Sequence, residues 1–494
     1  MRIQGLISFV VFFVATSIGL TAVGAAHAQS VNEGDAEIAA LKRQLLLIEQ
    51  KLDRLQKQTA ANTAATAKAN ARVDANASTN AAIPAKASLV PSGAIVKMPN
   101  NRPTICTDDN LNCVAVTSRL HFDAGGYNYR PNSTATTPQQ AQNGVNARRA
   151  RIGVLGTFMG DWDYGLIFNL SGSQNNTAII NNAFVTYKGI KGLYIEGGYI
   201  KVPYTLDEST SSNDITFMER ASSAVIAAHI ASGNNRSAFG ARANGDWWWL
   251  GSYLTGPTSG FPHSTRPPFG ATARGVVVPL NNQYGSLLLG ADAEFLFDTG
   301  TSSGAPLNSD NLTALNSRIE VRIDPGTNAL LNTGTLANVN SVRVLSGEAA
   351  GSIGSFYVQG EYFDYSVQRF TGLPSLHFNG GYAQASYVLT GEQRKYNPVT
   401  GSYGGINPKD PVEWETPGWG AWEVAARYSQ ITLNDLNVLG GELRNATFGV
   451  NWYVNSNIRF MFNWIHGNVA KFTPTNTNIG AHYDAFAMRT QVAF

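Results

Sequence analysis

The segment YDAFAMRTQVAF, residues 483–494, alternates strictly between two kinds of side chain. One phase holds Phe486, Met488, Thr490, Val492 and Phe494, and the other holds Arg489 and Gln491. A period of two predicts a β-strand with one apolar face and one polar face. Similar segments precede it from about residue 117, and a secretory signal opens the chain. We therefore interpret residues 483–494 as the closing strand of an outer-membrane β-barrel.

Residues 1–28 have the layout of a secretory signal peptide. Arg2 supplies the charged start, residues 6–20 are mainly apolar, and Ala26-His27-Ala28 is a small-residue cleavage site. The alternative is an uncleaved membrane anchor, for which the apolar run is barely long enough. The cleavage site followed by a polar segment favours an exported chain. No later stretch is apolar for long enough to span a membrane as a helix, so any crossing must use strands.

The composition agrees with a barrel. The chain has 49 Gly, 10% aromatic residues and 14% charged residues, against about 25% charged residues in typical soluble proteins. Residues 117–494 hold 25 Lys and Arg against 26 Asp and Glu, a formal net charge of −1. The +2 of the whole chain therefore does not arise in the barrel, and any ion selectivity must be local.

An N-terminal segment, residues 29–58, has a heptad pattern. Its apolar positions are Ile38, Leu41, Leu45, Ile48, Leu52 and Leu55. These positions are spaced alternately by three and four residues, which predicts a short α-helical coiled coil. A single amphipathic helix lying on the barrel is the alternative, although its apolar stripe is normally broader.

Residues 59–116 indicate a spacer and linker. Residues 59–82 are rich in Ala, Asn and Thr, which favours a weakly helical spacer, and residues 83–103 carry four prolines, which favours an extended linker. Cys106 and Cys113 follow as the only cysteines, and an oxidising compartment predicts a disulfide between them. Asp108 and Asp109 between them suggest a metal loop as an alternative, but the spacing and closing Glu of a calcium site are missing.

Residues 117–494 repeat the alternation of the last strand. In 162–170 the apolar set is Trp162, Tyr164, Leu166, Phe168 and Leu170, with polar Asp163 and Asn169 between. Short turns such as 160–161 and long loops at 256–269 and 391–418 connect the segments, and short turns at one end with long loops at the other are typical of barrels. Of seventeen candidate strands we assign 317–324 to a loop, which predicts an all-β, transmembrane antiparallel barrel of sixteen strands.

Several segments resemble the phosphate-selective porin O/P family of Gram-negative bacteria. They are RRARIGVLGTFMGDWDYGLIFNL from Arg148, YIKVPYTLDESTSSNDITFMERA from Tyr199, QGEYFDY from Gln359, YVLTGEQRKY from Tyr387, GAWEVAARYS from Gly420, GELRNATFGVNWYVNSNIRFMFNW from Gly441, and the terminal MRTQVAF. Together they cover nearly all of 117–494.

The resemblance implies a trimer of sixteen-stranded barrels whose third loop, here 202–233, folds inward to form an anion-binding narrowing. Arg148, Arg149 and Arg151 match the family's arginines at this narrowing, and Arg220 lies in the loop. Phosphate-specific members add lysine clusters. This barrel has only six lysines against 19 arginines, which argues against strong phosphate specificity.

The residue chemistry also favours anions. Arginine replaces the water that an anion loses with planar, permanently charged donors. Arg149 and Arg151 share the inward phase of one segment, and Arg427 and Arg489 lie inward on others. The alternative is that each arginine pairs with an inward acid and braces the wall.

We therefore expect an outer-membrane porin for passive diffusion of small anions such as phosphate, with a periplasmic N-terminal segment. The alternatives are a weakly selective porin, or a tether from the outer membrane to the cell wall through the coiled coil. The expected partners are small anionic solutes, outer-membrane lipid and lipopolysaccharide, further copies in a homotrimer and the cell wall, without nucleic acid. We expect no enzyme, metal or cofactor, because the histidines are scattered without zinc spacing and no nucleophile elbow occurs.

Overall fold

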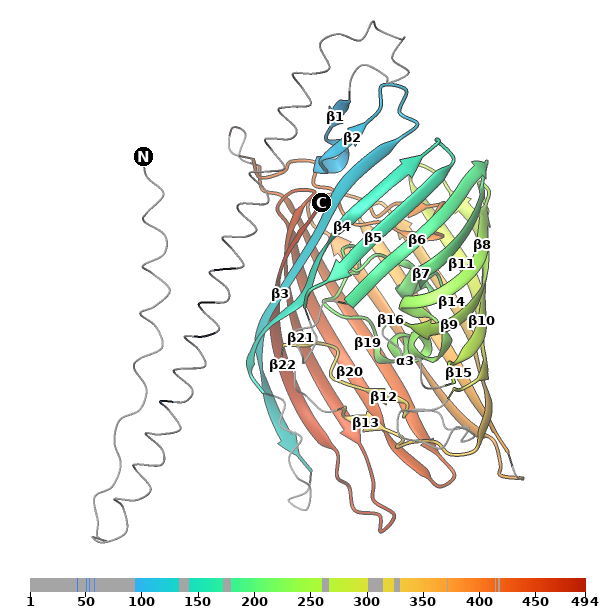
Figure 1. Ribbon diagram of the computed structural model, residues 1–494. Coiled ribbons are helices and arrows are strands. Elements are labelled where there is room, and N and C mark those ends of the chain that lie inside the picture. The colour runs from blue at the N-terminus through green and yellow to red at the C-terminus, as the bar shows by residue number, and fades with distance from the viewer. Residues whose placement is uncertain are drawn as a thin grey trace, which may run out of the picture. The chain divides into compact units, whose positions relative to one another are not determined.

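The structure, a computed structural model, describes residues 42, 50, 53 and 57 and then 94–132, 142–171, 179–259, 266–300, 314–323, 329–370, 372–413, 415 and 418–494. Sixteen antiparallel strands form a closed barrel (Figure 1), because each strand pairs with the next and the last pairs with the first. This closure confirms the predicted sixteen-stranded barrel and leaves no strand edge of the wall exposed.

The strands of the wall follow one another around the barrel in chain order. The first eight are β3 (Cys113–Pro131), β4 (Gly144–Phe158), β5 (Trp162–Asn169), β6 (Ile179–Ile190), β7 (Leu193–Val202), β8 (Gly233–Asn244), β9 (Trp248–Thr258) and β10 (Phe269–Asn281). The last eight are β11 (Gly285–Asp298), β14 (Val339–Ile353), β15 (Phe356–Arg369), β16 (Leu376–Val388), β19 (Ala421–Asp435), β20 (Val438–Tyr453), β21 (Ile458–Ala470) and β22 (Ala481–Ala493).

The two faces of the wall follow the alternation in the sequence. On β22, the Phe486 side of the strand is exposed on the outside, with Phe486 57% accessible, whereas Arg489 on the inner side is fully buried. Leu166 and Phe168 are likewise exposed on the outside of β5. An apolar outer band of this kind fits a lipid environment. Lipid tails offer no hydrogen bonds, but the closed ladder pairs the backbone N–H and C=O groups of every wall strand with those of its neighbours.

The two ends of the barrel differ in their connections. The end that carries the start of β3 and the end of β22, called the terminal end below, has the short turns 159–161, 191–192, 245–247, 282–284, 354–355 and 454–457. It also carries the loop 389–420, so our expectation that long loops share one end is wrong for this loop. The other long connections, including 203–232 and 299–338, lie at the opposite end.

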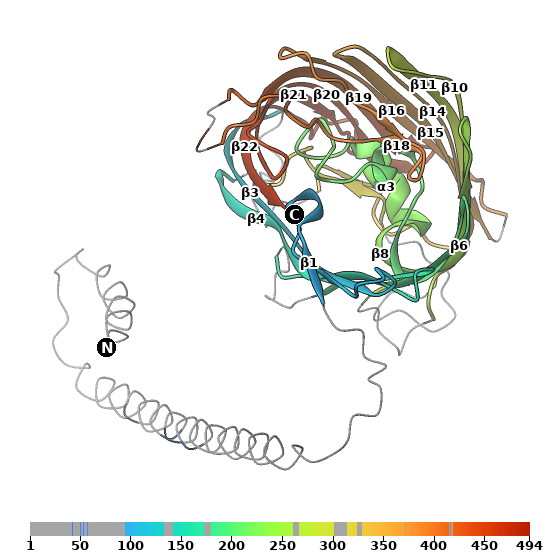
Figure 2. The ribbon, with the colours of Figure 1, turned by 90° about the horizontal axis from the view of Figure 1, so that it is seen from above.

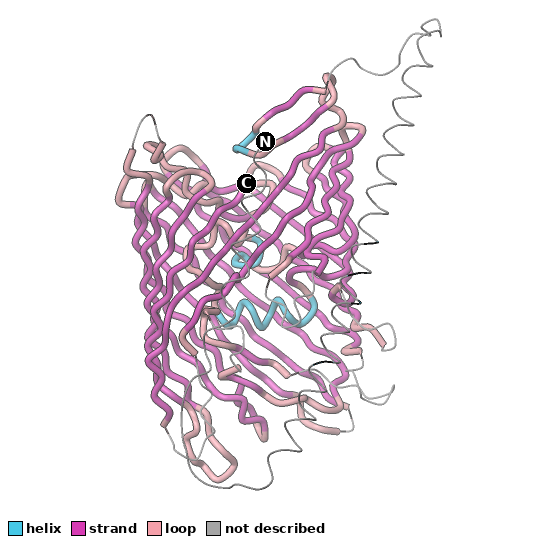
Figure 3. Tube along the Cα trace, turned by 60° about the vertical axis from the view of Figure 1, so that its left-hand side comes forward, coloured by secondary structure: helices cyan, strands magenta, loops and turns pink. Residues whose placement is uncertain are grey.

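Three connections enter the barrel from its two ends (Figures 2 and 3). Loop 203–232 contains α2 (Leu206–Ser209) and α3 (Ser222–Ala231), and loop 389–420 contains β17 (Tyr396–Asn397) and β18 (Ser402–Tyr403). Connection 299–338 contains β12 (Asn316–Ser317) and β13 (Leu331–Asn332). These insertions pack against the inward side chains of the wall, so the core of the protein lies inside the barrel.

Residues 318–323 form no strand of the wall, which confirms the assignment of this segment to a loop. Ile319, Val321 and Ile323 are each at most 3% exposed and belong to the same apolar cluster as residues of α3. Their alternation therefore arises from packing inside the barrel. Residue 324 lies outside the described residues.

A small hairpin precedes the barrel where we expected extended linker and loop. It consists of β1 (Ile95–Lys97), a 3₁₀ turn, η1 (Pro99–Asn101), and β2 (Thr104–Cys106). A disulfide joins Cys106 to Cys113 at the start of β3, so β2 continues the ladder and the barrel strand begins before the expected residue 117. Proline at the first position of the turn suits its fixed backbone angle.

Of the predicted coiled coil, only Lys42, Gln50, Asp53 and Lys57 are described, and all four are helical. Lys57 Nζ donates to Asp53 Oδ2 at 2.8 Å, one turn away. The predicted signal peptide, the heptad positions and the spacer 59–82 lie outside the described residues. Among the helices that are described, none is both long and apolar enough to cross a membrane.

Candidate functional site

A cavity of about 310 Å³ lies inside the barrel, between the wall and the two inserted loops 203–232 and 389–420. Its charged lining residues are Arg119 on β3, Arg151 on β4, Lys201 on β7, and Asp214 and Arg220 on loop 203–232. The described residues that line the cavity thus include four basic side chains and one acidic side chain. A second cavity of about 230 Å³ shares Lys201 and several other lining residues with the first.

Arg119 and Arg151 carry charges that no neighbouring acid neutralises directly. Arg119 donates to Ser212 Oγ at 2.6 Å and to Ser211 Oγ at 3.4 Å, both on the inserted loop. Arg151 Nε is buried without a hydrogen-bond partner. Within the described residues, neither guanidinium forms an ion pair, so both leave positive potential in the cavity.

Lys201 and Arg220 share one acid. Glu208 on α2 lies 3.7 Å from Lys201 Nζ and 3.5 Å from Arg220 Nε. Burial raises the pKa of Glu208, but the charges of Arg220 and Lys201 outweigh burial and hold this pKa below its usual value. Glu208 is therefore ionised and cancels one of the two positive charges.

Arg148 and Arg149 both point inward because β4 carries a bulge. In the pairing with β3, His121 lies opposite Arg149 and Phe122 lies opposite Ala147, so Arg148 is the extra residue. A bulge places two successive side chains on one face, which strict alternation forbids. As a result both arginines reach the same carboxylate on the inserted loop.

That carboxylate belongs to Glu219. Arg148 binds it with two contacts of 2.8 and 3.0 Å, Arg489 Nη2 donates to it at 2.7 Å, and Arg149 lies 3.4 Å away. Burial raises the pKa of Glu219, but these three arginines reverse the shift and hold the pKa well below its usual value. Glu219 is thus an ionised anchor that fixes loop 203–232 to β4 and β22.

Two other predicted residues also hold this region together. Arg489 makes a two-point contact with Asp123 on β3, at 2.6 and 2.7 Å. Arg427 on β19 donates to Glu320 at 2.7 Å and to the carbonyl of Glu219 at 2.9 Å. Asp123 and Glu320 are themselves at most 3% exposed.

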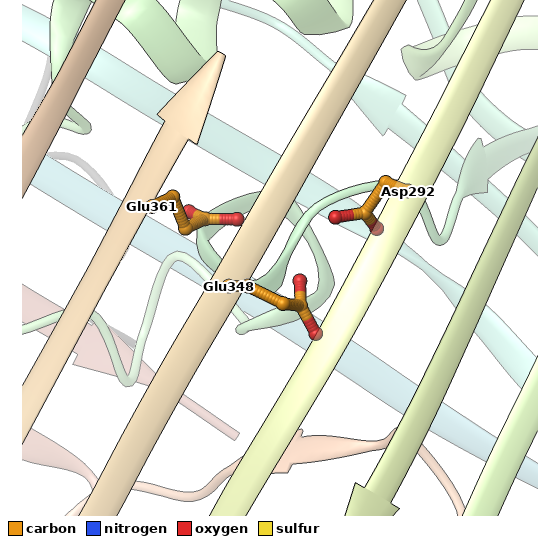
Figure 4. A group of neighbouring side chains, drawn as sticks. All are labelled: Asp292, Glu348 and Glu361. Atoms are coloured by element: carbon orange, nitrogen blue, oxygen red, sulfur yellow. The ribbon is translucent and has the colours of Figure 1, made fainter.

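Buried carboxylates of the opposite wall hold the start of α2. Glu361 accepts from the backbone N–H groups of Leu206 and Asp207 at 2.7 and 3.1 Å, and Asp292 accepts from Thr205 at 3.1 Å. Figure 4 shows them on neighbouring strands with Glu348, which accepts from Arg274 at 2.7 Å. All three acids therefore have protein donors, and the group acts as a loop anchor rather than a set of free metal ligands.

The six predicted arginines thus separate into two groups. Arg151 and Arg220 line the cavity, although Arg220 also pairs with Glu208. The other four pair with acids and do not line the cavity, and these are Arg148, Arg149, Arg427 and Arg489. Sequence reasoning missed Arg119 and Lys201 as site residues. The signal for Arg119 was its inward phase beside outward Leu120, and the signal for Lys201 was its place at the mouth of the inserted loop.

Comparisons with known proteins agree with this architecture. The model of the family "Phosphate-selective porin O and P" matches residues 114–494. Porin O of Pseudomonas aeruginosa is 27% identical over 384 residues, covering 70% of this chain and 81% of the relative. An uncharacterized protein of Caulobacter vibrioides is 26% identical over 440 residues, covering 87% and 83%.

Among solved structures, OmpT of Vibrio cholerae matches 78% of this chain and 98% of its own, with a TM-score of 0.47 and 10% identity. An anion-selective porin from Comamonas acidovorans matches 78% and 100%, with a TM-score of 0.45 and 13% identity. The family match extends over the whole closed barrel and both inserted loops. The chain therefore belongs to the phosphate-selective porin O and P family and is an outer-membrane porin.

Proposed function

We propose that the protein is a passive channel for small anions, with its selective narrowing at the cavity between β3, β4, β7 and the two inserted loops. The observation that carries the proposal is the charge of this cavity, where Arg119, Arg151, Lys201 and Arg220 meet a single lining acid. The barrel as a whole is close to neutral. Field lines nevertheless focus in a narrow passage with low-dielectric walls, so a local excess of charge decides which ions enter.

The hydroxyl groups beside Arg119 complete the site. Because Ser211 and Ser212 accept hydrogen bonds from Arg119, their own hydroxyl protons are free to point toward a passing ion. An anion that loses part of its water then finds both charge and donors. A cation is attracted mainly to Asp214, whose carboxylate lies beside Gly405 of loop 389–420.

The remaining predicted arginines have a positioning role in this proposal. Arg148, Arg149 and Arg489 hold loop 203–232 through the carboxylate of Glu219. Arg427 holds the loop through the carbonyl of Glu219, and through Glu320, which accepts from the backbone N–H of Ser222. They fix the width of the passage rather than bind the ion. The loop would otherwise be an ordinary exposed connection with more freedom.

Phosphate is a weak ligand in this proposal. Of the six barrel lysines, only Lys201 lines the cavity, so phosphate meets no lysine cluster there.

The terminal end faces the periplasm, because short turns mark that side in bacterial barrels, and the resemblance to the family supports a homotrimer. A tether to the cell wall would depend on residues outside the described part of the chain.

The test is the reversal potential of the purified full chain in a planar bilayer under a KCl gradient. We expect chloride to be more permeant than potassium, and phosphate to reduce the chloride current only at millimolar concentration or above. Preference for potassium would overturn the proposal. Block by micromolar phosphate would overturn the assignment of phosphate as a weak ligand.

A further inference from the structure

The narrowing has an apolar side as well as a charged side. Ile167 on β5 and Phe184 on β6 line the 310 Å³ cavity together with the four basic residues. Phe184 also lines the adjoining 230 Å³ cavity, beside Ile200 and Trp249. Both Ile167 and Phe184 are partly exposed, although they sit on the inner face of the wall.

The Phe184 ring is held in place by its neighbours. It packs against a buried cluster of Ile200, Val202 and Tyr253 on β7 and β9. Gly165, its cross-strand neighbour on β5, leaves room for the ring, since a Cβ there would lie 2.5 Å from it. The ring is therefore a fixed part of the passage and is shared by both cavities.

A small hydrated ion gains nothing from this apolar side. Phosphate carries tightly held water on every side, and Ile167 and Phe184 offer no donor to replace it. An organic anion differs, because its charged group needs donors only at one end while its apolar part gains by leaving water. Cavities of roughly 300 Å³ and more, mainly apolar with a few well-placed polar groups, are typical sites for small organic ligands.

We propose that the preferred solutes are small organic anions with one carboxylate and an apolar body, such as aromatic or branched aliphatic carboxylates. The carboxylate lies against Arg119 and Arg151, with Ser211 and Ser212 as further donors, and the apolar body lies against Ile167 and Phe184. This inference rests on the proposed anion channel and names its substrate class.

The test measures how added benzoate, acetate and phosphate each reduce the chloride current of the full chain. We expect benzoate to block at about a tenfold lower concentration than acetate, because only its ring buries apolar surface, and at a lower concentration than phosphate. Phe184→Ala should lower the ratio of the acetate blocking constant to the benzoate blocking constant toward one. A ratio within one variant cancels any change in the chloride current that affects both blockers equally.

Phe168→Ala is the matched control, because Phe168 is also an aromatic residue of this wall but is exposed on the outside of β5. It should keep the wild-type ratio. Ile167→Ala provides a second luminal variant if Phe184→Ala does not fold, and it should lower the same ratio.

The outcomes separate the two proposals. Equal block by acetate and benzoate, stronger block by phosphate, or a ratio unchanged in both luminal variants would overturn the organic-anion inference. The chloride-to-potassium permeability ratio, measured in the same membranes, tests the anion channel independently. Anion selectivity without a preference for benzoate would therefore reject only this inference, and cation selectivity would reject the channel proposal itself.

Discussion

Arg489, close to the end of the chain, donates to Glu219 in the inserted loop at 2.7 Å. The same carboxylate binds Arg148 and Arg149, so one acid joins the first and last parts of the barrel to the loop that narrows it. Among the described residues, Arg148 and Arg149 have Glu219 as their one acidic partner, whereas Arg489 also pairs with Asp123. The close approach of the three arginines therefore depends on the charge of Glu219, because buried like charges repel.

Replacing Glu219 by Gln should loosen loop 203–232. The substitution keeps the shape but removes the charge that compensates Arg148, Arg149 and Arg489, and breaking such a buried arrangement typically costs about 3–5 kcal/mol. We expect a lower temperature for the heat-induced mobility shift on gels and larger, noisier single-channel currents. Glu442→Gln is the control, since Glu442 pairs with exposed Arg444. Wild-type stability and conductance for Glu219→Gln would contradict the anchoring role.

Replacing Arg151 by Met should reduce the preference for chloride without closing the pore. One charge at a water-filled wall contributes about 1 kcal/mol, which corresponds to roughly a fivefold change in permeability ratio. Reversal potentials under a salt gradient measure the effect. Arg444→Met, on the outer face of β20 with a side chain 56% exposed, should leave the ratio unchanged. If Arg151→Met and Arg444→Met gave the same permeability ratio, Arg151 would not contribute to the selectivity of the site.

The anion preference should rise as the pH is lowered. Burial raises the pKa of Asp214 from its usual value, against the opposing charges of Arg394 and Arg119. A raised pKa means that the carboxyl takes up a proton at a higher pH than an ordinary Asp, so the only acid that lines the cavity among the described residues becomes neutral on acidification.

Asp214→Asn tests this assignment. The variant should already show the higher anion preference at pH 7, and its preference should depend less on pH than that of the wild type. Asp161→Asn, in an exposed turn at the terminal end, is the control. A pH dependence identical in Asp214→Asn and the wild type would assign the titration to another group.

The sequence predicted the wall better than the interior, for a physical reason. Alternation is a local property of a strand facing lipid, so the outward position of Leu166 and Phe168 and the inward position of Arg489 followed directly from it. The inward position of Arg148 depends on a bulge, and a bulge is set by pairing with β3. Single-strand periodicity contains no information about that pairing.

The acids that pair with the arginines could not be predicted from the sequence either. Whether Arg427 faces water or pairs with an acid depends on Glu320, which is 107 residues away in a segment that forms no wall strand. The length of loop 389–420 was evident, but its insertion depends on contacts such as Arg394 with Glu423 and Tyr403 with Tyr357. Such contacts form only when the barrel closes.

Arg394 should hold loop 389–420 inside the barrel. Its guanidinium donates to Glu423 on β19 at 3.1 Å and to the carbonyl of Asp214 at 2.7 Å, so it joins the two inserted loops. Met in its place would leave Glu423 buried with Arg459, at 3.9 Å, as its one cationic neighbour in the described part of the chain. We expect Arg394→Met to lower the temperature of the gel-mobility shift and to increase single-channel conductance as the loop withdraws.

The double variant Arg394→Met with Glu423→Gln separates these two effects. It removes the buried carboxylate that has lost its contacts to Arg394, while Arg459 keeps its hydrogen bonds to the carbonyls of Ile215 and Thr216. Stability should therefore recover in part, as replacing both members of a buried pair often costs little. The loop still lacks its contact to Asp214, so the conductance should stay high. Recovery of wild-type conductance in the double variant would mean that the loop is held by its aromatic contacts with β15 and not by Arg394.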